Sequence, residues 1–131
     1  MAVRGKRPVK VALLLGTAAT ALVCAGCEKG STQPGPSSPV AQVSISVTPQ
    51  GCEPHPATVT TDGVSVKVSN VDAAAVSEVE LRSHDLATLA GEEENLVPGL
   101  SGGFGVWLTP GHYVFSCPGA RRPHWPFTVR G

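Results

Sequence analysis

The sequence predicts an all-β fold, a sandwich of seven or eight short strands. Three observations predict it: apolar and polar residues alternate along short segments, turn signals separate those segments, and no apolar pattern of helical period extends over a useful length. Short strands with one apolar face bury that face by packing two sheets together, so a sandwich is expected.

The first half of the domain shows the alternation most clearly. Val43, Ile45 and Val47 share one face of the first strand, and the same pattern returns over 64–69 after an Asp-Gly hairpin signal at 62–63. We expect further short strands at 58–60, 78–82 and 86–89, and a long acidic loop over 91–99.

The second half predicts three more strands, at 104–108, 113–117 and 125–129. A Pro-Gly turn separates the first two of them, and we expect Val114 of the middle strand to lie in the core. Cys117 ends that middle strand, which places a cysteine at one pole of the sandwich.

Residues 1–26 are typical of a secretory signal peptide. Four basic residues precede an apolar stretch over 11–23 that is too short to span a bilayer comfortably. The following Val-Cys-Ala-Gly-Cys over 23–27 resembles a bacterial lipobox, which predicts cleavage before Cys27 and lipidation of Cys27. The alternative is ordinary signal-peptidase cleavage nearby, which would leave Cys27 as a stray thiol.

Residues 27–40 predict a flexible linker between the lipid anchor and a domain at 41–131, because 28–39 contain only Glu, Lys, Gly, Ser, Thr, Gln and Pro. The predicted location is extracytoplasmic, with the chain anchored to the cell membrane. Cleavage would leave six basic residues against all ten acidic residues, a net charge of −4. That charge argues against nucleic acid as a partner and is compatible with cation binding.

Several short motifs follow one another through the domain. They are Gly-Cys-Glu-Pro at 51–54, Val-Ser-Val-Lys-Val-Ser-Asn at 64–70, Glu-Val-Glu-Leu at 78–81, Glu-Glu-Asn-Leu-Val-Pro-Gly at 93–99, Leu-Thr-Pro-Gly-His-Tyr at 108–113 and Ser-Cys at 116–117. In this order and spacing they resemble the cupredoxin-like domain of the EfeO-type iron-uptake lipoproteins. The resemblance covers about residues 43–117.

The resemblance implies a Greek-key cupredoxin-like sandwich that binds iron or copper, or assists redox metal handling in iron uptake. It also implies a metal site at Cys52, Glu80, Glu94 and Cys117. Proteins of this family usually carry a second, imelysin-like helical domain. A stand-alone sandwich is therefore expected to need a partner, such as an imelysin-like protein or an iron permease.

The residues themselves leave two alternatives open at Cys52 and Cys117. Two cysteines in a small extracytoplasmic domain most often form a disulfide, in which case no metal cofactor is expected and the sandwich is an interaction module. The other alternative is a thiolate metal site in which Glu80 or Glu94 is the hard ligand. His124 and His55 are the additional imidazole candidates.

A complete blue-copper centre is not expected. Such a centre needs two histidines, a cysteine and usually a weak axial methionine. Met1 is the only methionine, and it lies in the predicted signal peptide. No arrangement of residues indicates nucleophilic catalysis, so we assign no catalytic residue.

Overall fold

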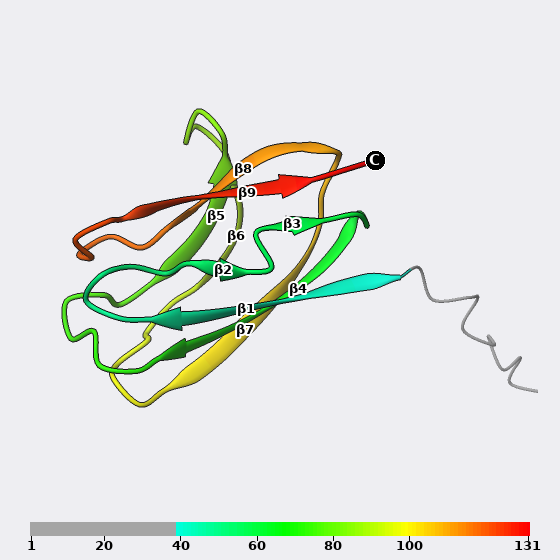
Figure 1. Cartoon of the computed structure of the whole chain (residues 1–131). Helices are drawn as coiled ribbons and strands as arrows, with labels where there is room; N and C mark the ends of the chain where they lie inside the picture. The colour runs from blue at the N-terminus through cyan, green and yellow to red at the C-terminus, as the bar shows by residue number, and fades with distance from the viewer. Residues whose placement is uncertain (1–38) are drawn as a thin grey trace, which may run out of the picture. The chain divides into compact units, whose positions relative to one another are not determined.

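The computed structural model describes residues 39–131. The predicted signal peptide at 1–26, nearly all of the predicted linker, and Cys27 lie outside the described residues. In the described part the chain forms a sandwich of two β-sheets (Figure 1). No helix in the range 39–131 is long and apolar enough to cross a membrane.

The described residues form nine strands. They are β1 (Val40–Val47), β2 (Pro54–His55), β3 (Thr58–Val59), β4 (Gly63–Asn70), β5 (Val79–Ser83), β6 (Leu89–Glu93), β7 (Ser101–Trp107), β8 (Gly111–Ser116) and β9 (His124–Val129). One sheet has the order β2-β1-β4-β7 and the other the order β3-β9-β8-β5-β6. The pairs β1–β4 and β3–β9 are parallel, and the other neighbours are antiparallel.

The chain crosses repeatedly between the two sheets, and this brings four distant loops to one end of the sandwich (Figure 1). We call this end the cysteine pole; its loops are 48–53, 71–78, 94–100 and 117–123. A backbone hydrogen bond from Leu96 N to Ser77 O at 2.9 Å joins two of these loops, and one from Gly99 N to Asn70 O at 2.8 Å joins a loop to the end of β4.

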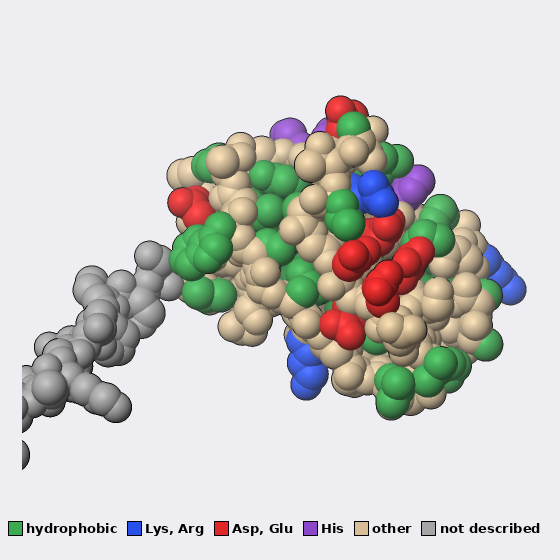
Figure 2. Space-filling model, turned by 180° about the vertical axis from the view of Figure 1, so that it is seen from behind, with side chains coloured by type: hydrophobic (Ala, Val, Ile, Leu, Met, Phe, Trp, Pro, Cys, Tyr) green, Lys and Arg blue, Asp and Glu red, His purple; other side chains and the backbone are tan. Residues whose placement is uncertain are grey.

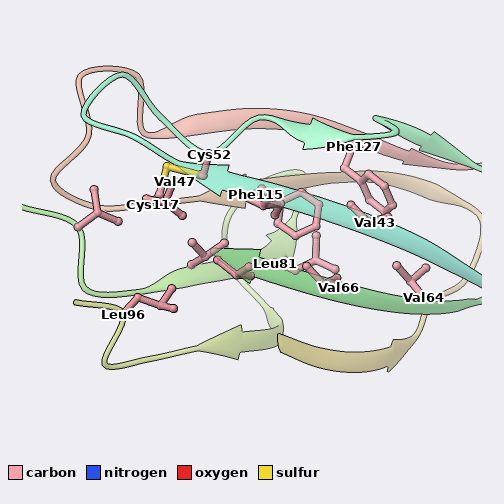
Figure 3. Packing of buried hydrophobic residues seen from close by; sticks show 14 of the residues in the cluster. Val43, Val47, Cys52, Val64, Val66, Leu81, Leu96, Phe115, Cys117 and Phe127 are labelled. Carbon is pink, nitrogen blue, oxygen red and sulfur yellow. A yellow bond between two sulfur atoms is a disulfide. The ribbon is translucent and has the colours of Figure 1, made fainter. Parts of the chain in front are cut away.

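The core lies between the sheets and is built from the alternating strands (Figure 3). The predicted aliphatic residues of β1, β4 and β5 are buried, as is Val129 of β9. The prediction for Val114 was wrong, because Phe115 enters the core from β8 and successive side chains of a strand point to opposite faces. Phe115 packs edge-on against Phe127, with ring centroids 5.2 Å apart, and Val114 is half-buried on the outer face.

The acidic segment begins in a strand and not in the predicted loop. β6 starts at Leu89, where the sequence predicted a short strand to end, and it continues through Glu93. It pairs antiparallel with β5 after a turn in which Asp85 accepts a hydrogen bond from Ala87 N at 3.1 Å. As the edge strand of its sheet, β6 is largely exposed, so it carries little of the alternation that reveals a buried strand.

Candidate functional site

The two cysteines of the cysteine pole are joined to each other. Cys52 and Cys117 form a disulfide with their Cα atoms 6.2 Å apart, across a sequence separation of 65 residues. Both residues are 0% exposed. Figure 3 shows the bridge at the end of the core, beside Val47. The sulfurs are therefore part of the packed interior and not of an open cleft.

Cys52 reaches Cys117 because the loops around them run side by side. Arg121 N donates to Pro49 O at 3.0 Å, and Arg122 N donates to Gln50 O at 2.9 Å. These two bonds join the loop after β1, in one sheet, to the loop before β9, in the other. The turn after Cys117 also needs Gly119, which has φ +96° and lies so close to Ala75 O that a Cβ atom would overlap it.

Trp125 covers the residue before Cys52. A Cβ atom on Gly51 would overlap the indole, so the ring packs directly on this glycine. The indole Nε1 donates to Arg122 O at 2.9 Å, and the Arg122 guanidinium lies 3.9 Å from the ring centroid. The positive charge of Arg122 is thus held against the aromatic face.

Asn70 connects three segments of the pole, a role that the sequence analysis missed. Its side chain is buried; Oδ1 accepts from Ala73 N at 2.9 Å, and the amide donates to Ala73 O, Val76 O and Leu96 O. The available signal was an asparagine at the end of a valine-rich strand, where its side chain bonds to the backbone of the following turn. Asn70 fixes the 71–78 and 94–100 loops in place.

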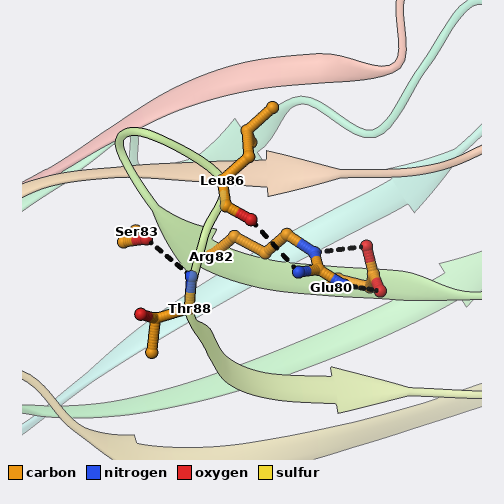
Figure 4. Close-up of polar contacts among 5 residues, drawn as sticks. All are labelled: Glu80, Arg82, Ser83, Leu86 and Thr88. Carbon is orange, nitrogen blue, oxygen red and sulfur yellow. Dashed lines mark hydrogen bonds and ion pairs between the residues drawn. The ribbon is translucent and has the colours of Figure 1, made fainter.

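Glu80 lies on the outer face of β5, where Arg82 binds it (Figure 4). The hydrogen bonds from the Arg82 guanidinium, together with its positive charge, lower the pKa of Glu80, while burial opposes them. The same contact raises the pKa of Arg82. Arg82 also donates to Leu86 O at 3.2 Å, so the ion pair is tied to the β5–β6 turn.

The outer face around Glu80 is acidic. Glu92 is the cross-strand partner of Glu80, and both Glu92 and Glu78 help to raise the pKa of Arg82. Figure 2 shows acidic side chains gathered on this face beside a basic one. Glu94 is exposed just beyond β6.

The two candidate histidines are exposed and lie on different sheets. His124 on β9 pairs with Ser116 on β8, and His55 on β2 pairs with Ser44 on β1. Within residues 39–131, no group of three or more His, Cys, Asp or Glu side chains is arranged to hold a metal ion. The structure brings Cys52 and Cys117 together, but it does not gather Glu80 and Glu94 with them into a metal-binding group. The four-residue ligand set stays a prediction for the reduced protein.

Comparison with solved structures supports the fold, while comparison with sequences finds no match. No protein-family model matches this chain, and no curated protein sequence matches it. Three solved structures that resemble it are cupredoxins. Reduced auracyanin from the photosynthetic bacterium Roseiflexus castenholzii has a TM-score of 0.52 and 14% identity over 70% of this chain and 97% of its own.

Auracyanin B has a TM-score of 0.56 and 15% identity over 72% of this chain and 91% of its own. Reduced rusticyanin has a TM-score of 0.54 and 13% identity over 70% of this chain and 79% of its own. The described part of the chain therefore has the cupredoxin-like β-sandwich fold that the sequence analysis predicted.

Proposed function

We propose that this chain is an extracytoplasmic, lipid-anchored protein with the cupredoxin fold. Its role in metal handling is to bind a partner protein, as an interaction module that is cross-linked by a disulfide. The observation that carries the proposal is the Cys52–Cys117 disulfide, whose two residues are fully buried. A cysteine binds a metal ion as a thiolate, and a cysteine in a disulfide cannot supply one. In the oxidised protein the cysteine pole therefore offers a surface to a partner and not a ligand to an ion.

The docking surface we propose consists of Val71, Val97 and Leu100, on the loops of the cysteine pole. Their side chains are 59%, 57% and 50% exposed. Two hydrogen bonds hold them near one another, from Leu100 N to Val97 O at 3.0 Å and from Asn70 N to Leu100 O at 2.9 Å. Apolar side chains that gather on a rigid surface are typical of protein–protein contact sites.

The resemblance to EfeO-type lipoproteins indicates which class of protein the proposed partner belongs to. An imelysin-like protein or an iron permease would supply the helical or membrane component that the sandwich lacks. The adjacent acidic face, with Glu78, Glu80 and Glu92 around one arginine, favours a partner with a basic rim, since opposite charges speed and orient docking.

The second candidate function is metal binding by the reduced protein. The observation that favours it is the position of both sulfurs at one pole of a cupredoxin-like fold. Reduction would release two thiolates, which suit copper or iron better than calcium. The disulfide and the metal site exclude each other, so the redox state of the cysteines decides between the two candidates.

Thiol titration and metal analysis distinguish the interaction module from the metal-binding site. The protein is purified without reductant, dialysed against copper or iron and then against buffer, and assayed for free thiols in denaturant. We expect neither Cys52 nor Cys117 to react and no metal to be retained at the pole. Two reactive thiols together with one retained copper or iron, lost in Cys117→Ser, would overturn the interaction module in favour of the metal site.

The docking surface has its own test, which is crosslinking in intact cells. Leu100→Glu and Val97→Glu should remove the crosslinked partner. The matched control is Val40→Glu, which places the same charge on an apolar side chain that is 47% exposed but lies at the start of β1. Equal loss in all three variants, or loss in none, would contradict this surface.

A further inference from the structure

A shallow hollow on the outer face of the five-stranded sheet is rimmed by histidines. Its volume is about 230 Å³, and its lining residues include His84, His112 and His124 together with the apolar Val114 and Pro126. These are three of the four histidines in the whole sequence. Neither candidate function proposed above uses this hollow.

Two of these imidazoles lie next to each other. The rings of His84 and His112 have centroids 6.3 Å apart and planes inclined at 88°. The register of the sheet brings them together, because Ser83 at the end of β5 is the partner of Tyr113 in β8. His84 directly follows Ser83 and His112 directly precedes Tyr113, so antiparallel pairing places both at the same end of the two strands.

The spacing of the rings fits one shared metal ion. A metal ion lies about 2.0–2.1 Å from a coordinating imidazole nitrogen. Two imidazoles on one ion therefore have ring centroids roughly 4.5 to 6.4 Å apart, as the angle between the two bonds opens from about 90° to about 180°. The observed 6.3 Å lies at the wide-angle end of this range, so the two rings are spaced as they would be with one ion between them.

The ring of His112 is already held by a second contact. Its Nδ1 lies 3.3 Å from Thr128 Oγ1, across the β8–β9 pair. When Nδ1 carries the proton and donates to this oxygen, the free lone pair is on Nε2. A ligating histidine is oriented in this way by the partner of its other nitrogen. Both histidines are exposed, so water can complete the coordination.

We propose that His84 and His112 form a two-imidazole site for a divalent transition-metal ion, with Cu²⁺ bound most tightly. Imidazole nitrogen suits copper, nickel and zinc, and copper stands highest among the divalent ions in affinity. His112 lies near the start of β8 and Cys117 follows its end, so this site is separate from the disulfide. It needs no thiolate and forms in the oxidised protein.

The site is tested by titration calorimetry with Cu²⁺ alone. The sample is the whole mature protein, oxidised and kept in detergent. We expect one ion whose affinity falls at least tenfold in His84→Ala and in His112→Ala. The double variant should lose little more than either single variant, because one remaining imidazole cannot chelate. His55→Ala and His124→Ala are the matched controls and should bind like the wild type.

Thr128→Val supplies a second readout, since it leaves both ligands in place but removes the contact to His112 Nδ1. We expect a smaller loss of affinity than either ligand variant shows. Unchanged binding in His84→Ala or His112→Ala would overturn the proposal, and so would an equal loss in His124→Ala. Because both ligands are exposed, unchanged circular dichroism should confirm that each variant is folded.

Discussion

Glu80 and Arg82, two residues apart on the outer face of β5, share two hydrogen bonds. Arg82 Nε donates to Glu80 Oε2 at 2.8 Å, and Arg82 Nη2 donates to Glu80 Oε1 at 2.6 Å. Only 12% of the Glu80 side chain is exposed. Both carboxylate oxygens are engaged, so a metal at the cysteine pole would have to compete with this guanidinium for Glu80.

The first prediction concerns this ion pair. Because the folded-state pKa of Glu80 lies below its ordinary value of 4.5, the ion pair contributes stability above about pH 4.5 that is lost as the pH falls through the lower, folded-state pKa. Arg82→Met should therefore lower the free energy of unfolding at pH 7, and lower it much less at pH 3. Urea unfolding at the two pH values measures the difference.

The control for that experiment is Arg130→Met, which removes an exposed arginine near the end of the chain. It should leave the free energy of unfolding nearly unchanged at both pH values. A loss in Arg82→Met that is as large at pH 3 as at pH 7 would show that packing, and not the charge of Glu80, is responsible.

The second prediction concerns the disulfide. A bridge that closes a loop of 65 residues should stabilise the fold by about 4 kcal/mol through the reduced entropy of the unfolded chain. The Cys52→Ala/Cys117→Ala variant should lose roughly that amount in guanidinium unfolding. Its stability should no longer respond to reductant. A loss below about 1 kcal/mol would mean that the bridge constrains the unfolded chain very little.

The third prediction concerns Asn70. Asn70→Asp keeps the shape of the side chain but replaces the amide donor, leaving three buried carbonyl groups beside a carboxylate. We expect a cost of about 2–3 kcal/mol and faster hydrogen exchange at the Ala73 and Gly99 amides. The exposed Gln42→Glu is the charge-matched control and should change neither quantity.

The fourth prediction concerns the anchor, which lies outside the described residues. The wild-type protein should fractionate with membranes and partition into detergent. Cys27→Ser should release it or block its processing, while the fold of 41–131 remains the same. Recovery of wild-type protein wholly in the soluble fraction, with an N-terminus elsewhere than Cys27, would show that no lipid is attached at this residue.

The alternation of apolar residues was sufficient to predict the strands that have one buried and one exposed face. It could not assign the faces of β8, because Tyr113, Val114 and Phe115 are all apolar enough to be buried. It also missed most of β6, since an exposed edge strand is defined by its partner β5 and not by a pattern of its own.

The ion pair between Glu80 and Arg82 was not predicted, although residues two apart share one face of a strand and the sequence therefore contained its signal. The sequence contained no such signal for the neighbours His84 and His112, since their contact depends on the register between β5 and β8. The contacts of Asn70 depend in the same way on loops that meet only after the sheets have formed.

The position of the disulfide has a consequence for the order of events during biosynthesis. Cys52 precedes β2 and Cys117 follows β8, so the bridge encloses seven of the nine described strands. A chain that emerges from a ribosome or a membrane channel with its N-terminus first exposes Cys52 early. Cys52 cannot form the bridge until β8 and then Cys117 have emerged. The disulfide could therefore form only in a nearly complete sandwich. An oxidase could not trap a partly emerged domain by joining these two cysteines.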